Sequence, residues 1–161
     1  MSAAKPPGTP PVMVGWREWA TLPAFGVDWI KVKVDTGART SAIHAFDVTE
    51  SVRGGQRWVE FSIHPWQGTA ADAVQVSLPV ADVRTVRSSS GHSEERLVVR
   101  TPISLAGRTV TAELTLTRRD DMGFRMLVGR ELLRQGFAVD PSASYKGGRP
   151  PRGTRHRNRG R

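Results

Sequence analysis

Short runs of alternating apolar and polar residues cover most of this sequence, and such alternation is typical of β-strands with one buried face. The clearest run is Ile30-Lys31-Val32-Lys33-Val34. Glycine and proline separate the runs, as they do where strands are joined by tight turns. We therefore expect strands near residues 12–16, 30–34, 58–64, 74–78, 82–88, 96–104, 109–117, 126–128 and 137–139, with a hairpin turn at 105–108.

One segment has the pattern of a helix instead. It covers residues 130–135, and Gly136 follows at the position that favours a left-handed C-terminal cap. The sequence thus predicts an all-β, barrel-like fold with one short helix near its C-terminal end.

Length and charge indicate the domain organisation. The chain has 161 residues, enough for one domain with a sizeable core, and its net charge is +9. Seven basic residues and no acidic residue lie in 146–161, so the preceding part is nearly balanced in charge. We predict a disordered Pro/Gly-rich leader at 1–11, a folded domain at 12–145 and a disordered basic tail at 146–161. This tail either contacts RNA, the ribosome or another polyanion, or only keeps the protein in solution.

Two features that the sequence lacks restrict the kinds of protein it can encode. The sequence has no cysteine, which excludes disulfides, thiolate zinc sites and cysteine nucleophiles. It also has no N-terminal apolar segment of the kind that directs secretion, and no apolar run of the roughly 18 residues that a membrane span needs. We therefore expect a cytoplasmic protein without membrane contact.

The residues Asp35-Thr36-Gly37-Ala38 follow the predicted strand at 30–34 directly. A strand that delivers an aspartate into a Thr-Gly turn is what an aspartic peptidase requires. Its carboxylate must lie at the bottom of a cleft, and glycine lets the backbone approach closely. A second signature, Met126-Leu127-Val128-Gly129-Arg130, lies far downstream. Together, in this order, the two signatures predict a retropepsin-type peptidase with one catalytic aspartate per chain.

A single aspartate motif has a consequence for assembly. In the aspartic-peptidase reaction two carboxylates share a proton: one acts as a base toward water, and the other supplies a proton to the substrate carbonyl. The chain carries one Asp-Thr-Gly and no internal repeat, so the second carboxylate must come from a second subunit. We expect a two-fold symmetric homodimer in which Asp35 faces its twin. The Thr36 hydroxyl would lock the two turns together, and Gly37 would allow their close approach.

Four segments together carry a family resemblance. They are 14–19 (Val-Gly-Trp-Arg-Glu-Trp), 33–42 (Lys-Val-Asp-Thr-Gly-Ala-Arg-Thr-Ser-Ala), 87–92 (Arg-Ser-Ser-Ser-Gly-His) and 118–130, which ends in the second signature. With them, about residues 14–145 resemble the bacterial retropepsin-like family often labelled ATP-dependent zinc proteases and associated with RimK-type glutamate ligases. The resemblance implies a retropepsin-like fold with Ala38, Gly129 and Arg130 as structural motif residues. It also implies removal or processing of glutamate tails on a small-subunit ribosomal protein.

The resemblance also places a flap, the hairpin that closes over substrate. By its spacing from Gly129, the flap tip falls at Ser88-Ser89-Ser90-Gly91-His92, and an ordinary exposed hairpin turn is the alternative. The stretch 50–79 exceeds what a minimal retropepsin needs, so we expect an added strand pair or a surface insertion there.

Arg39 departs from minimal viral retropepsins, which usually carry an acidic residue after Asp-Thr-Gly-Ala. The change puts a cation at the edge of the predicted cleft. The other arginines near that cleft are Arg87, beside the flap, and Arg118, Arg119 and Arg125, before the second signature. Guanidinium groups can bind carboxylates with two hydrogen bonds, so this set favours an acidic substrate. Each arginine could instead be solvated or paired internally, for example Arg39 or Arg130 with Glu131.

We expect no cofactor. The sequence has no Gly-rich phosphate-binding loop for ATP, and no His-Glu-x-x-His motif for zinc. Its histidines are scattered, at positions 44, 64, 92 and 156. If the cleft does bind zinc, His44 and His92 are the candidate ligands, because both lie in segments that would border it.

The leading hypothesis is a homodimeric aspartic endopeptidase that hydrolyses an acidic peptide, such as the oligoglutamate tail of a ribosomal protein. The catalytic turn would be Asp35, Thr36 and Gly37, with substrate contacts from the flap and the neighbouring arginines. Two alternatives remain open: a zinc-dependent protease, as the family label suggests, and a non-catalytic module that holds acidic tails in the same cleft.

Overall fold

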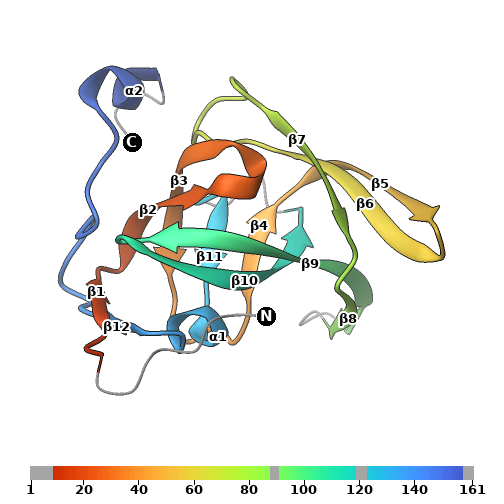
Figure 1. Cartoon of the computed structure of the whole chain (residues 1–161), viewed down its shortest axis with the longest axis horizontal. Coiled ribbons are helices and arrows are strands. Elements are labelled where there is room, and N and C mark those ends of the chain that lie inside the picture. The colour runs from red at the N-terminus through yellow and green to blue at the C-terminus, as the bar shows by residue number, and fades with distance from the viewer. Residues whose placement is uncertain (1–8, 88–90, 119–122, 158–161) are drawn as a thin grey trace.

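The computed structural model describes residues 9–87, 91–118 and 123–157, and most of these residues lie in β-strands (Figure 1). One sheet has the strand order β10-β4-β11-β3-β2-β9-β8. Its members are β2 (Arg17–Leu22), β3 (Val27–Val34), β4 (Ser41–His44), β8 (Asp82–Arg87), β9 (Ser93–Leu105), β10 (Arg108–Thr117) and β11 (Met126–Val128). Because β10 also pairs with β9, six of these strands close into a barrel and β8 extends beyond it.

Strand β11 lies between β3 and β4, the two strands that flank the predicted catalytic turn. It runs parallel to β3, with Val128 opposite Val34, and antiparallel to β4. At its end the N–H of Asp35 donates to the carbonyl oxygen of Val128 at 2.9 Å. A strand distant in sequence therefore fixes the base of the turn.

Alternate residues of the barrel strands form the core, as the period of a strand requires. In β3, Ile30, Val32 and Val34 are buried, whereas Lys33 is exposed. Lys31 points outward and is nevertheless only 7% exposed. Its ammonium lies 5.6–5.9 Å from the ring centres of three aromatic residues that cover this part of the barrel: Trp19, Phe124 and Tyr145. Such contacts let a lysine be buried with its charge stabilised.

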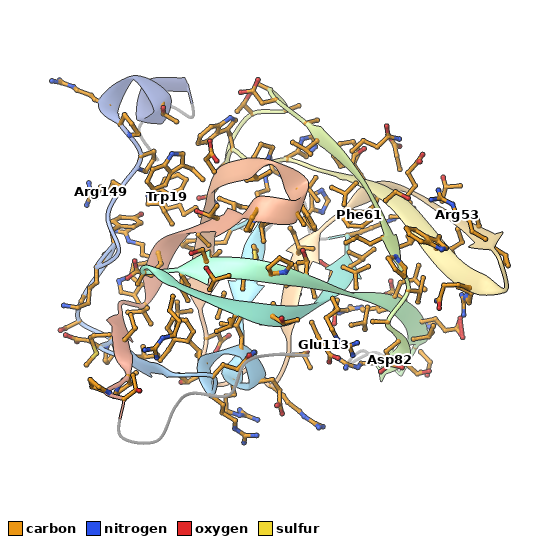
Figure 2. All side chains as sticks on the ribbon, in the orientation of Figure 1. Trp19, Arg53, Phe61, Asp82, Glu113 and Arg149 are labelled. Carbon is orange, nitrogen blue, oxygen red and sulfur yellow. The ribbon has the colours of Figure 1, made fainter. Side chains whose placement is uncertain are left out.

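A second, antiparallel sheet of three strands covers the region in which the sequence predicts an added strand pair or a surface insertion. It contains β5 (Phe46–Arg53), β6 (Gln56–Ile63) and β7 (Val74–Pro79). Phe61 of β6 is fully buried, and its ring meets Phe25 of η1 (Pro23–Phe25) edge to face at 5.9 Å, which attaches the sheet to the barrel. The β5–β6 hairpin extends away from the barrel, with Arg53 near its end (Figure 2).

The segments 12–15 and 137–147 are tied together beside the barrel. Strands β1 (Val12–Val14) and β12 (Phe137–Val139) pair in parallel, and β12 follows α1 (Arg130–Leu133). Glu18 of β2 is completely buried, and its carboxylate accepts the backbone N–H groups of Gly15, Lys146 and Gly147 at 2.7, 2.9 and 3.0 Å. One side chain thereby fixes both the N-terminal and the C-terminal segment.

The structure departs from the predicted helix content. Besides the helix predicted at 130–135, it contains η1 and α2 (Arg152–Arg157). Proline favours the first turn of a helix, and Pro23 opens η1 while Pro151 directly precedes α2. At the start of the predicted tail, Lys146 and Gly147 are held through their backbone N–H groups, an interaction that does not depend on apolar side chains. The leader residues 1–8 lie outside the described residues, and the domain boundaries stay a prediction.

All nine predicted strands have counterparts in the structure, and the sequence missed β2, β4 and β5. In β2 the buried Glu18 interrupts the apolar alternation, and β4 is only four residues long. No helix in the described part of the chain is long and apolar enough to cross a membrane.

Candidate active site

The carboxylate of Asp35 is held by the turn that follows β3. The N–H of Gly37 donates to Asp35 Oδ1 at 2.9 Å, and the N–H of Ala38 donates to the Asp35 carbonyl oxygen at 3.2 Å. A Cβ atom at position 37 would lie 3.1 Å from Oδ1, closer than most such contacts, so glycine keeps this approach unhindered. Asp35 is half-buried, whereas Thr36 and Gly37 are exposed. The turn therefore presents an oriented carboxylate at the surface of the single chain.

The second sequence signature closes onto the first. The backbone N–H of Arg130 donates to the Ala38 carbonyl oxygen at 2.8 Å, and Nη1 of Arg130 donates to the carbonyl oxygens of Thr36 and Gly37 at 3.0 and 3.2 Å. Arg130 thus holds three consecutive carbonyl groups of the predicted catalytic turn. In this way the structure brings the two signatures together.

Position 129 needs a glycine because the two signatures pack closely against each other there. A Cβ atom there would lie 2.6 Å from the Thr40 carbonyl oxygen and 2.8 Å from that of Ala38. The Gly129 N–H donates to Oγ of the buried Ser41 at 2.9 Å. The backbone after the turn and the start of α1 are therefore in direct contact.

Arg39, the departure from viral retropepsins, forms an ion pair with Glu131 of α1. The Nε–Oε1 distance is 3.4 Å, and the Arg39 side chain is 78% exposed. Glu131 also meets Arg134, at 3.5 Å. Of the internal pairings left open by the sequence, Arg39 with Glu131 is present, and Arg130 binds backbone carbonyl groups.

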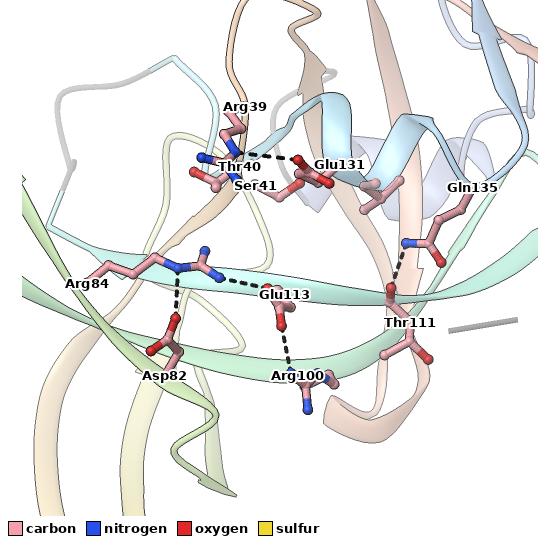
Figure 3. Close-up of a pocket in the computed structure, with 11 residues that line it drawn as sticks. Arg39, Thr40, Ser41, Asp82, Arg84, Arg100, Thr111, Glu113, Glu131 and Gln135 are labelled. Carbon is pink, nitrogen blue, oxygen red and sulfur yellow. Dashed lines mark hydrogen bonds and ion pairs between the residues drawn. The ribbon is translucent and has the colours of Figure 1, made fainter. Parts of the chain in front are cut away.

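A groove begins at Arg39 and lies between the start of β4, helix α1 and the strands β8, β9 and β10 (Figure 3). Its volume is about 980 Å³. The lining residues are Arg39, Thr40, Ser41, Asp82, Arg84, Arg100, Thr111, Glu113, Glu131, Leu132 and Gln135. Charged side chains on both walls make it a polar groove, and its lining residues Arg39, Thr40 and Ser41 follow the predicted catalytic turn in the chain.

Glu113 is the centre of an ion-pair network on the strand side of the groove. Its carboxylate accepts hydrogen bonds from Arg84 at 2.8 Å and from Arg100 at 2.7 Å, and Arg84 also meets Asp82 at 3.1 Å. The hydrogen bonds from Arg100 and Arg84 lower the pKa of Glu113, and the bond to Glu113 is the main cause that raises the pKa of Arg84. Glu113 and Arg84 therefore remain charged at neutral pH.

The predicted flap lies where β8 and β9 form a hairpin. Arg87, the last residue of β8, is paired in register with Ser93 of β9. Gly91 has a positive φ of 85°, and His92 is exposed. The tip residues Ser88, Ser89 and Ser90 lie outside the described residues, so the role of this hairpin as a lid stays a prediction.

Among the other predicted cleft arginines, the two that the structure describes have different surroundings. The half-buried Arg125 donates from Nε to the Trp66 carbonyl oxygen at 3.4 Å and does not line the groove. Arg118 is exposed, and Arg119 lies outside the described residues. The assignment of Arg125 to substrate binding also stays a prediction.

The histidine candidates occupy unlike environments. His44 is buried, and its ring stacks with Phe46 and His64 at centroid distances of 6.3 and 6.0 Å, whereas His92 is exposed. Across 9–87, 91–118 and 123–157, no three His, Cys, Asp or Glu side chains are close enough together to hold a metal ion.

The sequence reasoning missed the charged residues on the strand side of the groove: Asp82, Arg84, Arg100 and Glu113. A signal for two of them was available. The predicted turn at 105–108 sets the register of the β9–β10 hairpin, in which Arg100 lies directly opposite Glu113. Oppositely charged residues at such positions form cross-strand pairs. The contact to Arg84 comes from a third strand and has no comparable local signal.

Comparisons with known proteins agree with this geometry. A family model described as "RimB-like: Retropepsin-like aspartic endopeptidase RimB" matches residues 13–150. A probable alpha-L-glutamate ligase from Shewanella pealeana is 45% identical over 133 residues, which are 83% of this chain and 29% of that protein. A protein of the same name from Desulfotalea psychrophila is 43% identical over 130 residues, 81% of this chain and 28% of that one. The chain thus spans less than a third of the length of these curated relatives.

A solved structure has a similar fold. It is a Legionella pneumophila protein of unknown function, which superposes with a TM-score of 0.72 at 25% identity and covers 84% of this chain and 98% of its own. The barrel, the two joined signatures and the family match over 13–150 confirm the resemblance seen in the sequence. The chain belongs to the RimB-like family of retropepsin-like aspartic endopeptidases.

Proposed function

We propose that this chain is an aspartic endopeptidase whose working form is a homodimer, with Asp35 of each subunit at the two-fold axis. The observation that carries the proposal is the catalytic turn: its carboxylate is oriented by Gly37 and its backbone is held by Arg130. Thr36 and Gly37 are exposed beside it, so a second copy can reach the turn. Two such turns would supply the two carboxylates that the reaction needs.

In this proposal one Asp35 is ionised and its twin is protonated, because two adjacent carboxylates do not both ionise readily. The ionised carboxylate takes a proton from water as the water oxygen bonds to the scissile carbonyl carbon. The protonated carboxyl gives its proton to the carbonyl oxygen. The tetrahedral intermediate then breaks its C–N bond, the amine leaves with a proton, and the shared proton of the pair is restored.

We further propose that the substrate is acidic and carries a glutamate extension. Two observations support this substrate class. Arg39 places a largely exposed guanidinium four residues after Asp35, among the residues that line the groove. The relatives are named probable alpha-L-glutamate ligases, so a domain like this chain occurs in one polypeptide with the remainder of those proteins. A peptidase next to a ligase could shorten the extension that the ligase makes.

The test compares Asp35→Asn with the wild-type protein on a protein substrate bearing an oligoglutamate tail, with products identified by mass spectrometry. We expect cleavage by the wild type and none by Asp35→Asn, while both elute as folded dimers. Asp28→Asn is the matched control, because Asp28 is an exposed aspartate that precedes the turn by most of β3, and it should cleave normally.

Two results would contradict the proposal. Cleavage by Asp35→Asn that stops on addition of a metal chelator would favour zinc-dependent hydrolysis. Tight binding of the tailed protein without cleavage by the wild type would favour a module that only holds acidic tails.

A further inference from the structure

The groove beside the catalytic turn is bordered on one side by the chain that leaves Asp35 and on the other by the β8–β9 hairpin. Arg39 and Thr40 continue the turn into the groove, and Asp82 and Arg84 belong to the strand that leads to the predicted flap. Figure 3 shows these two sets of side chains facing each other. A peptide extended away from Asp35 along Arg39 would enter this space, whose volume is ample for side chains.

We infer that this groove is a subsite for a carboxylate side chain of the substrate, distant from the scissile bond, and that Arg39 and Arg100 are its specificity-determining residues. The inference rests on the proposed peptidase function and adds to it the residues that recognise acidic substrates. It concerns the groove itself, so binding can test it separately from catalysis.

Both arginines have donors available for a ligand. A guanidinium group carries five N–H donors. In the ion pairs among the described residues, Arg39 uses Nε toward Glu131, and Arg100 uses one Nη toward Glu113. Their side chains are 78% and 51% exposed. Each can therefore bind a substrate carboxylate while it keeps its internal partner.

The pairing of the charged side chains favours an anion over a cation. On the α1 side of the groove, Glu131 is already held by Arg39 and Arg134. On the strand side, Glu113 is already held by two arginines. The carboxylate oxygens of Glu113 are therefore poorly placed to bind a basic side chain of a ligand as well. The internal carboxylates orient the guanidinium groups and reduce the ordering that binding requires.

The experiment measures binding in the Asp35→Asn background, which prevents cleavage. Fluorescence anisotropy is recorded with a labelled oligoglutamate peptide and with an oligoglutamine peptide of equal length. We expect tighter binding of the oligoglutamate peptide. Arg39→Gln and Arg100→Gln should each reduce this preference roughly five- to tenfold, as expected for charge-assisted hydrogen bonds that are partly exposed to solvent.

Arg134→Gln is the matched control. It removes the same charge and an ion pair to the same Glu131, but Arg134 does not line the groove. It should change the preference by less than about twofold. An equal effect of Arg134→Gln and Arg39→Gln would overturn the subsite, because the preference would then follow net charge alone.

Failure of the subsite and failure of the proposed function give different results. If the two peptides bind equally, or if Arg39→Gln and Arg100→Gln retain the full preference, the subsite is refuted even where wild-type protein cleaves. If the preference depends on Arg39 and Arg100 but wild-type protein cleaves neither peptide nor a tailed protein, the subsite stands and the peptidase proposal fails.

Discussion

Gly129→Ala tests whether the second signature holds the proposed catalytic turn in place. The added Cβ atom would lie 2.6 Å from the carbonyl oxygen of Thr40 and 2.8 Å from that of Ala38, whereas ordinary van der Waals contact begins at about 3.4 Å. Both neighbours are backbone atoms and cannot rotate away. Either α1 or the segment after the turn must move, and the hydrogen bond from Gly129 to Ser41 would be strained.

The size of the effect follows from this overlap. Overpacking of this kind costs about 1–3 kcal/mol, and a chain of this length loses roughly 2–4 °C in Tm per kcal/mol. We expect the Tm to fall by about 2–12 °C. Activity should fall further, because a displacement of a catalytic group by about 1 Å can reduce the rate about 100-fold.

The assay combines thermal unfolding with kcat/KM on an oligoglutamate-tailed protein. Gly123→Ala is the control, since a Cβ atom at this position would meet no atom within 4 Å and the residue has no positive φ. It should leave both quantities close to wild type. If Gly129→Ala matched Gly123→Ala in Tm and in kcat/KM, the proposed clamp between the two signatures would be refuted.

Three further substitutions test other parts of the structure. Glu18→Gln replaces one acceptor oxygen of a buried carboxylate that binds three backbone N–H groups, so urea denaturation should show a loss of about 2–4 kcal/mol; an unchanged midpoint would contradict this role. Glu113→Gln tests the ion-pair network. The folded-state pKa of Glu113 is lowered, so the Glu113 carboxylate stabilises the folded protein at pH values above its unfolded pKa of about 4.3. This stabilisation is lost as the pH falls through the folded-state pKa. Screening at this partly exposed site limits it to about 1 kcal/mol or less, and a Tm difference from wild type that stayed constant from pH 7 to pH 3 would contradict the assignment. Arg130→Lys removes the planar group that reaches Thr36 and Gly37, so kcat should fall about tenfold while the protein stays folded; unchanged kcat would show that the turn holds its shape without it.

Much of the fold was predictable because it depends on local patterns. The alternation in β3 and the turn between β9 and β10 are encoded within a few residues, and the structure has both where the sequence predicts them. Strand β2 was not predictable in this way. Its buried Glu18 contradicts the rule that charged residues face water, and the partners that make its burial favourable include Lys146 and Gly147, far along the chain.

The candidate site shows the same difference between features encoded locally in the sequence and features that depend on the tertiary fold. Asp35, Gly37 and the signature at 126–130 are recognisable in the sequence because a strand-turn motif is contiguous and β11 carries its own short pattern. The groove is assembled from β4, α1 and three strands of the β8–β10 region, and only the register of one hairpin connects any two of its charged residues in sequence. Arg84 contacts Glu113 only because the sheet brings β8 close to β10, and Glu131 lines the same groove only because β11 places α1 beside β4. No local sequence pattern could therefore reveal the groove. The sequence therefore identifies the proposed catalytic group, whereas the residues that we infer to select the substrate become apparent only from the tertiary fold.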